Sequence, residues 1–208
     1  MRSKQLRSKR KSTRVRAGEN IGKGSNSKSV EYPALPCKDG RYIAPNLVSK
    51  QTSEKVAEEE YKNVEGWPKQ DYPHLLFPVM MCEGATDYQV YAPYAKGTTF
   101  REFLRQKRIS QDDLYACFVA METLAHEVYR FNKNGYRHND VHESNVMYDP
   151  LTSTAVLIDF GLASRSRSPS RRGFATGPYG DFVNLRRLVR EVENRLQSSL
   201  DVKRYNFF

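Results

Sequence analysis

The chain has 208 residues, of which 38% are hydrophobic and 12% aromatic, a composition that excludes a wholly disordered protein and suits one domain-sized core. Of its net charge of +10, residues 1–30 hold +9, because they carry ten Lys or Arg and a single acid, Glu19. The remainder is nearly neutral, so the charge gives no reason to expect that the folded part binds nucleic acid. No apolar run approaches a membrane span, and no membrane association is expected.

Residues 1–19 read as a basic arm. Like charges repel along it and no apolar residue recurs at a regular spacing, so we expect this segment to be disordered. Such an arm can be a solubilising tail, an electrostatic contact with nucleic acid or a virion, or a nuclear-targeting or packaging signal. The sequence leaves these alternatives open.

The three cysteines, Cys37, Cys82 and Cys117, are scattered, odd in number and without a CxxC pair. This spacing indicates neither a zinc ribbon nor a disulfide framework. It favours a reducing, intracellular setting.

Residues 20–94 predict a β-rich region with one helix. Strand patterns occupy residues 29–32, 42–50, 75–81 and 88–94. The dipeptide Asp39-Gly40 predicts a hairpin turn between the first two. A helix is expected over 53–65, with Ser53 as its N-cap.

Residues 95–208 change to a helical pattern. The clearest helix runs from the capping Ser110 to Gly135, with apolar residues three and four apart. The other expected elements are a short helix over 98–106, a buried strand over 156–158 and a helix over 181–196. The sequence therefore predicts an α+β fold of two lobes, with the β-rich lobe first.

A group of polar residues follows the long predicted helix. His138, Asp140 and Asn145 come first, and Asp159-Phe160-Gly161 begins fourteen residues after Asn145. Asn145 and Asp159 offer the hard oxygen ligands that Mg²⁺ prefers, and Asp140 could accept a hydroxyl proton. In spacing and residue type, this group resembles the catalytic loop and the metal-binding motif of protein kinases.

The resemblance implies a two-lobed protein-kinase-like fold with a shortened helical C-lobe, and ATP and Mg²⁺ as cofactors. Asp140 would orient the acceptor hydroxyl and His138 would support the loop. Asn145 and Asp159 would bind the metal. Asp181 would match the aspartate that opens the helix bracing this loop.

Two upstream residues complete the expected catalytic set. Val48 and Lys50 share one face of a predicted strand, so Val48 would touch adenine while Lys50 reaches the phosphates. Three glutamates, at positions 58 to 60, compete as the partner of Lys50. Glu60 is favoured because it shares its i±4 row with two apolar residues, Val56 and Val64.

The nucleotide cradle is expected from family analogy. Gly22 and Gly24 resemble a degenerate phosphate-covering loop, in which Ser27 stands at the third glycine position. Val30 follows this loop. The run from Tyr91 to Ala95 would form the hinge whose backbone binds adenine, with Tyr94 and Ala95 as its binding residues.

The closest resemblance is to divergent kinase-like proteins of large double-stranded DNA viruses. The residues that carry it are the run from Tyr32 to Cys37 and the Leu47-Val-Ser-Lys50 strand. It implies a location in the host cell, and in the virion if the protein is packaged.

The acceptor is the least specified part of the analogy. His142 stands where Ser/Thr kinases carry a lysine, and the segment from Asp159 to Asp181 is short, basic and without an Ala-Pro-Glu motif. We expect a Ser/Thr-type protein kinase with a protein substrate. The alternatives are a small-molecule kinase, which His142 favours, and a non-catalytic binding module tethered by the basic arm. The oligomeric state stays open.

Overall fold

A computed structural model of the chain describes residues 19–22, 29–165 and 179–205, of which Glu19, Gly22 and residues 199–205 are described as backbone only. The predicted arm, apart from Glu19, lies outside these residues. So do Gly24 and Ser27 of the predicted phosphate loop, and residues 166–178.

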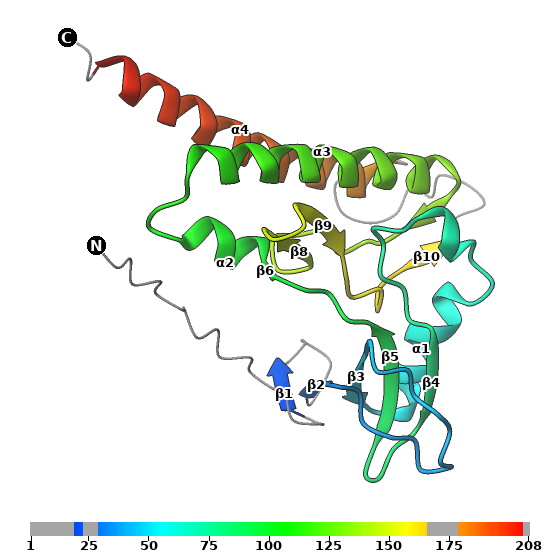
Figure 1. Cartoon of the computed structure of the whole chain (residues 1–208). Coiled ribbons are helices and arrows are strands. Elements are labelled where there is room, and N and C mark those ends of the chain that lie inside the picture. The colour runs from blue at the N-terminus through cyan, green and yellow to red at the C-terminus, as the bar shows by residue number, and fades with distance from the viewer. Residues whose placement is uncertain (1–18, 23–28, 166–178, 206–208) are drawn as a thin grey trace, which may run out of the picture.

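The N-terminal part is a five-stranded antiparallel sheet with one helix (Figure 1). The strand order is β1-β2-β3-β5-β4. The strands are β1 (Glu19–Gly22), β2 (Ser29–Tyr32), β3 (Leu47–Thr52), β4 (Met80–Glu83) and β5 (Tyr88–Pro93). Helix α1 (Glu54–Val64) packs against β4 and β5, and Ser53 occupies its predicted N-cap position. The short 3₁₀ helix η1 (Lys69–Asp71) follows it.

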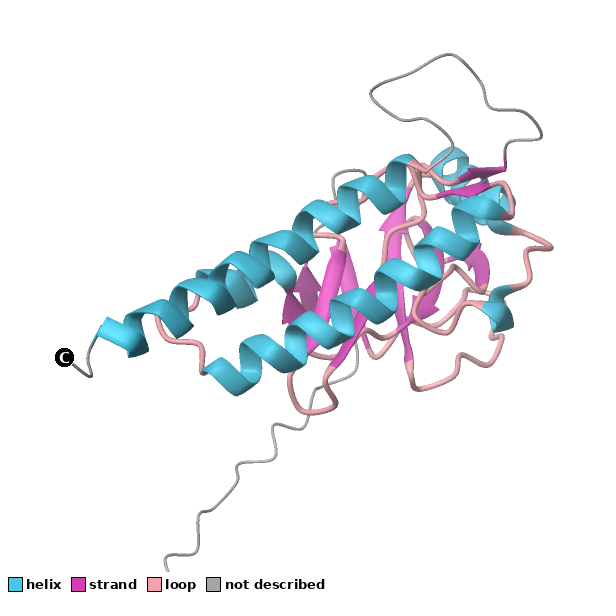
Figure 2. Cartoon of the chain, turned by 90° about the horizontal axis from the view of Figure 1, so that it is seen from above, coloured by secondary structure: helices cyan, strands magenta, loops and turns pink. Residues whose placement is uncertain are grey.

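The C-terminal part is mainly helical. Its helices are α2 (Phe100–Arg105), α3 (Gln111–Lys133) and α4 (Gly180–Tyr205). Its short strands are β6 (Thr98–Thr99), β7 (Tyr136–Arg137), β8 (Val146–Asp149), β9 (Thr154–Leu157) and β10 (Ser164–Arg165). Helices α3 and α4 lie side by side in both views (Figures 1 and 2), and their facing sides enclose the larger apolar core with β8 and β9.

Local signals set the starts of the helices. Thr99 accepts a hydrogen bond from the Glu102 N–H, and Glu102 reaches back to the Thr99 N–H, so α2 begins with a complete capping box. Ser110 caps α3 through the Asp113 N–H. Beyond the other end of α3, Gly135 has a φ of 85°, a left-handed conformation that glycine adopts without steric cost.

The predicted hairpin around Asp39-Gly40 is wrong. The turn exists, with a hydrogen bond from the Gly40 N–H to the Cys37 carbonyl, but no strand follows it directly. Strand β3 starts at Leu47, five residues later than the predicted start at residue 42. The β2–β3 connection is instead a long excursion whose prolines remove ladder donors. The predicted start of the next strand at residue 75 is also wrong. Leu75 makes only an isolated bridge with Leu157, and β4 begins at Met80.

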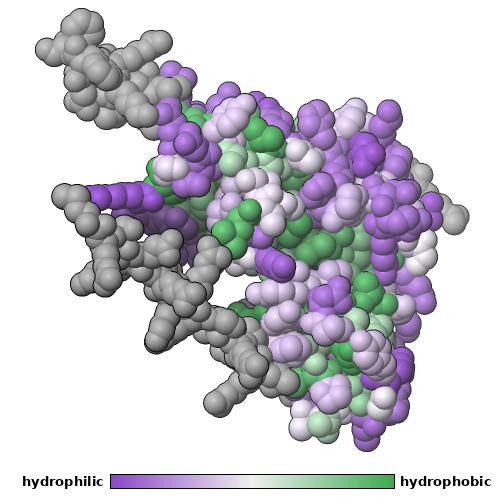
Figure 3. Space-filling model, in the orientation of Figure 1, coloured by the Kyte–Doolittle hydropathy of each residue, from purple (hydrophilic) through white to green (hydrophobic). Residues whose placement is uncertain are grey.

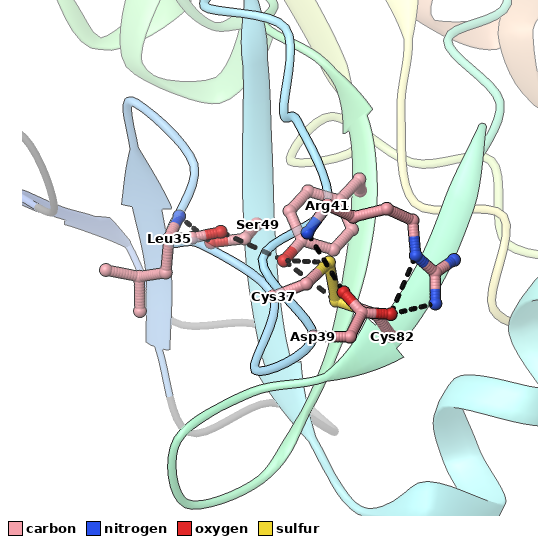
Figure 4. Close-up of a disulfide and its surroundings, with 7 residues drawn as sticks. Leu35, Cys37, Asp39, Arg41, Ser49 and Cys82 are labelled. Carbon is pink, nitrogen blue, oxygen red and sulfur yellow. Dashed lines mark hydrogen bonds and ion pairs between the residues drawn. A yellow bond between two sulfur atoms is a disulfide. The ribbon is translucent and has the colours of Figure 1, made fainter.

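A disulfide joins Cys37 in this excursion to Cys82 in β4, contrary to the expectation from the cysteine spacing (Figure 4). The two cysteines are 45 residues apart, and the sheet brings their Cα atoms to 5.9 Å. The Tyr91 hydroxyl lies against both sulfurs and donates to the Leu35 carbonyl. The bond removes the cysteine-based reason for expecting a reducing setting. Cys117 is free and buried in the core.

The molecule is therefore an α+β protein with a β-rich N-terminal part and a helical C-terminal part, as the sequence predicts. This arrangement is compatible with a kinase-like fold. The last helix is longer than predicted, since α4 continues to Tyr205 rather than ending at residue 196. In the described part of the chain, no helix has both the length and the apolarity to cross a membrane.

Candidate active site

A cavity of about 660 Å³ lies where the two parts of the molecule meet. Its N-terminal wall comes from β1, β2, β3, β5 and α1, and its C-terminal wall from β6, β8 and the segments around Asp140 and Asp159. Figure 3 shows apolar residues at the surface between the two parts and also on each part, among hydrophilic residues. The volume and the mixed lining are typical of a small-molecule site.

Lys50 joins the two walls. Its Nζ lies 2.7 Å from Glu60 Oε2 on α1 and 3.0 Å from Asp159 Oδ1 on the other wall. Of the three neighbouring glutamates, the structure turns Glu60 inward, with 4% of its surface exposed. Glu58 instead pairs with Lys62 on the outer face of α1. The lysine is thus fixed by one carboxylate from each part of the molecule.

Burial and charge act in opposite directions on these three groups. Burial disfavours the charged form of Lys50, but the carboxylates of Glu60 and Asp159 outweigh it and raise the pKa of Lys50. Burial likewise opposes ionisation of Asp159, yet Lys50 outweighs it and holds the pKa of Asp159 below its ordinary value. For Glu60, burial exceeds the attraction of Lys50 and raises the pKa of its carboxyl. A charged Lys50–Asp159 pair thus faces the cavity, beside a glutamate whose ionised form is costly.

Asp181 at the start of α4 shapes the loop that contains Asp140. Its buried carboxylate accepts hydrogen bonds from the N–H groups of His138 and Asn139, at 2.7 and 2.9 Å. Asn132 of α3 donates to the same carboxylate at 2.9 Å. Asn139 has a φ of 66°, a conformation that asparagine tolerates better than most residues. The bracing role expected for Asp181 therefore matches its contacts.

His138 is buried, with no exposed surface, and supports the backbone on both sides of the site. Its Nδ1 accepts the Asp140 N–H at 3.2 Å, and its Nε2 lies 3.0 Å from the Ile158 carbonyl, to which it donates. These partners require the neutral ring with its proton on Nε2. Burial also lowers the pKa of His138, which favours the same neutral form. It is a positioning residue that does not line the cavity.

Asp140 and Asn145 lie together at the cavity wall. The Asn145 amide nitrogen donates to both the backbone carbonyl and the Oδ2 of Asp140, each at 3.0 Å. This leaves the amide oxygen of Asn145 as the atom suited to a metal. His142 lies near the same carboxylate oxygen, with its Nε2 3.6 Å from Asp140 Oδ2, and its Nδ1 accepts the Ser144 N–H at 3.2 Å.

Asp159 is held at the cavity by an unusual backbone and by its neighbour. Its φ is 64°, and the next side chain, Phe160, is completely buried against the rings of His138 and Phe77. The Phe160 anchor lies in the core, while Asp159 faces Lys50. Two adjacent residues of the Asp159-Phe160-Gly161 motif therefore face the cavity and the apolar core, respectively.

The structure brings most of the predicted site residues to one cavity. Nine of them line it: Val30, Val48, Lys50, Glu60, Tyr94, Ala95, Asp140, Asn145 and Asp159. His138 lies behind the wall, and Gly22 ends β1 beside the cavity-lining Ile21. Gly24 lies outside the described residues, so its role stays a prediction.

Sequence reasoning missed the apolar inner lining. The residues are Ile21, Leu76, Val90, Met147 and Ile158, whereas the cavity-lining Ala92 lies within the predicted hinge. Val90 and Ala92 lie directly opposite Lys50 and Val48 in the β3–β5 ladder. The residue before Asp159, Ile158, carried a usable signal, because a residue that stands between a strand end and a predicted metal ligand is expected to border the same site. The strand pairing that places the others has no signature in the sequence.

Comparison with known proteins gives two matches and no matching family model. The chain is 28% identical over 148 residues to "Probable cell division control protein 7 homolog 2" and, equally, to "homolog 1", both of Encephalitozoon cuniculi (strain GB-M1). The alignment covers 70% of this chain but only 39% of either relative, so the chain spans well under half of their length. The two matches indicate a distant relationship to kinases.

Proposed function

We propose that this protein is a Ser/Thr-type protein kinase that transfers the γ-phosphoryl group of Mg-ATP to a protein hydroxyl. The observation that carries the proposal is the convergence of Lys50, Glu60, Asp140, Asn145 and Asp159 on one cavity, from both parts of the molecule. The names of the two relatives support a protein acceptor, because cell division control protein 7 is a Ser/Thr kinase.

The apolar part of the cavity suits a purine ring. Val30 and Val48 face it from the sheet, and Met147 and Ile158 from the helical part. The Tyr94 N–H donates to the Asn46 carbonyl, so in an extended chain the Pro93 carbonyl and the Ala95 N–H point to the opposite side, and both residues line the cavity. The Pro93 carbonyl and the Ala95 N–H would therefore bind the amine edge of adenine. The phosphates would extend toward Lys50.

The donor set fits Mg²⁺ that arrives with the nucleotide. Asp159 and Asn145 offer oxygen ligands. Among the described residues, no group of three or more His, Cys, Asp or Glu could hold a metal ion. Mg²⁺ is usually bound by one or two protein oxygens together with substrate phosphates and water. Asp159 and Asn145 would hold the ion, which neutralises phosphate charge when bound.

Asp140 would act on the acceptor. Its carboxylate, oriented by the Asn145 amide, accepts the hydrogen bond of the incoming hydroxyl. The acceptor oxygen forms a bond to the γ-phosphorus as the bond to the β-phosphate oxygen breaks. The hydroxyl proton passes to Asp140, and ADP leaves. Lys50 stabilises the phosphate charge during this transfer.

The decisive experiment measures label transfer from γ-labelled ATP with Mg²⁺ to a basic and to an acidic protein. Wild-type protein is expected to label at least one of them. Asp140→Ala should lower transfer by roughly 10³-fold or more, because the group that orients the hydroxyl is removed. Asp71→Ala, in the short η1 helix away from the cavity, is the matched control and should behave as wild type.

The outcomes separate the candidate functions. Nucleotide binding without transfer to any acceptor would contradict catalysis and support a binding module. Transfer to amino sugars or choline, but not to proteins, would support a small-molecule kinase. Transfer that survives Asp140→Ala would exclude the assigned role of Asp140.

Four further parts of the proposal come from the sequence. The viral likeness depends on the Tyr32–Cys37 run and the β3 strand. Contact with nucleic acid or a virion is assigned to residues 1–19, and the lobe boundary to residues 94 and 95. A location in the host cell follows from the viral likeness.

A further inference from the structure

Strands β1 and β2 form one side of the cavity but are joined to the rest of the sheet by a short ladder. Ile21 of β1 and Val30 of β2 line the cavity. In the described part of the chain, β1 stands at the end of the strand order and pairs with β2 (Figure 1). The β2–β3 ladder ends at the pair Glu31–Ser49 after three residue pairs, whereas the β3–β5 ladder has six. Backbone hydrogen bonds therefore fix the β1–β2 pair less firmly than they fix β3 and β5.

A stack of two aromatic rings gives β2 a second attachment. Tyr32, at the end of β2, stacks on Tyr94, which follows β5, with ring centroids 3.9 Å apart and ring planes 18° apart. The two backbones flank the start of β3. On one side the Ala34 N–H donates to the Leu47 carbonyl, and on the other the Tyr94 N–H donates to the Asn46 carbonyl. The stack thus spans β3 and connects two strands that are not neighbours in the sheet.

Of the two rings, that of Tyr94 belongs to the cavity wall, in the segment proposed to bind adenine, and Tyr32 stands behind it. Two aromatic rings in contact contribute stability beyond the apolar area that they bury. A movement of the β1–β2 pair away from the cavity would separate the rings and lose this contribution. The stack therefore opposes widening of the cavity on the side of Ile21 and Val30.

We propose that Tyr32 is a positioning residue for nucleotide binding, because its stack on Tyr94 holds the β1–β2 pair close to the adenine segment. The inference rests on the proposed nucleotide site and adds a residue that acts on this site without lining it. Asp140 and the Lys50–Asp159 pair are held by other contacts. Tyr32 should therefore affect the affinity for the nucleotide and leave the transfer step unchanged.

The test replaces Tyr32 by leucine, which keeps an apolar side chain but removes the ring. Calorimetric titration of the full chain with ATP and Mg²⁺ should give a dissociation constant roughly three- to tenfold above that of wild type, the range expected for one lost aromatic pair. At saturating ATP, kcat for a protein acceptor should stay within about twofold of wild type. Without nucleotide, the amides of β1 and β2 should exchange with deuterium roughly three- to tenfold faster, because these strands open more often.

Two variants serve as controls. Tyr32→Phe keeps the ring and removes the hydroxyl, so it should retain the affinity, kcat and amide exchange of wild type. Tyr42→Leu changes a tyrosine in the connection between β2 and β3 whose surface is 82% exposed, and it should also match wild type. Thermal melts of each variant show that it is folded.

The outcomes separate this inference from the proposed function. If Tyr32→Leu binds ATP as wild type does, the inference is overturned, whatever its exchange rates, and the proposed function stands. An equal loss of affinity in Tyr32→Phe would assign the effect to the hydroxyl and exclude the stack. A fall in kcat of Tyr32→Leu at saturating ATP would contradict a role confined to binding. If wild type binds no ATP, the proposed function itself fails, and this inference with it.

Discussion

Glu60 combines a cost to the fold with a benefit to the site. Its carboxylate is buried, and burial raises its pKa, so the ionised form is unfavourable except for the contact with Lys50. We expect Glu60→Gln to leave the free energy of unfolding unchanged or slightly higher, because a neutral amide of the same shape avoids the desolvation cost while Lys50 keeps the Asp159 carboxylate as its ion-pair partner. Phosphoryl transfer should fall by roughly tenfold or more, because Lys50 loses its partner on α1.

Thermal melts and initial rates of phosphoryl transfer, measured on the same preparations, test both expectations. Glu58→Gln is the matched control: it removes a glutamate two residues away whose partner, Lys62, is on the surface, and it should change neither quantity by much. A large loss of stability in Glu60→Gln would contradict the account, since it would give the ion pair a mainly structural role.

Helix phase was sufficient to choose Glu60 among three adjacent glutamates. A helix that packs on a sheet buries one row of residues, and only the row of Glu60 is otherwise apolar. The same reasoning could not place Val90 or Ala92 in the cavity. Their position depends on the pairing of β5 with β3, which joins residues about 40 apart by backbone hydrogen bonds.

Among the elements, helices were predicted more accurately than the connections between strands. Capping residues such as Thr99 and Ser110 act within one turn, so their effect is visible locally. The Asp39-Gly40 turn is also local and does form, but the chain beyond it follows the long-range tie between Cys37 and Cys82. A pairing over 45 residues leaves no local pattern.

The disulfide should stabilise this element through the unfolded state. Closing a loop of this length by a covalent bond typically contributes about 2–4 kcal/mol. We expect the double variant Cys37→Ser/Cys82→Ser to lose roughly this free energy of unfolding in denaturant titrations. The excursion would also detach more easily from β4, where the Lys38 N–H bonds the Glu83 carbonyl.

Dithiothreitol provides the internal control. It should lower the stability of wild type to that of the double variant and leave the double variant unchanged. Equal stability of oxidised and reduced wild type would show that the bond does not contribute. Cys117 is free and buried, so both proteins retain it and it cancels from the comparison.

For the whole molecule, the two-part plan was predictable from the change from strand to helix patterns, and the position of the candidate site from one linear motif. The residues from His138 to Gly161 carry most of the polar site within 24 positions of the chain. The shape of the cavity was not predictable, because each wall comes from a different part. Lys50 from the sheet and Asp159 from the helical part meet only after both have folded.

A ligand that contacts both walls should therefore stabilise the whole molecule. At a concentration about 100 times its dissociation constant, Mg-ATP would add about 2.7 kcal/mol to the stability of the folded state. For a chain of this size, that corresponds to a rise of roughly 5–10 °C in the melting temperature.

Asp159→Asn should abolish the Mg²⁺-dependent part of the rise while keeping the fold, because asparagine tolerates the positive φ at this position. Lys55→Met, on the exposed face of α1, is the control for Lys50→Met, which should lose most of the rise. An identical rise with and without Mg²⁺ would mean that Asp159 and Asn145 do not bind the metal. No rise at all would mean that the two walls do not form a nucleotide site.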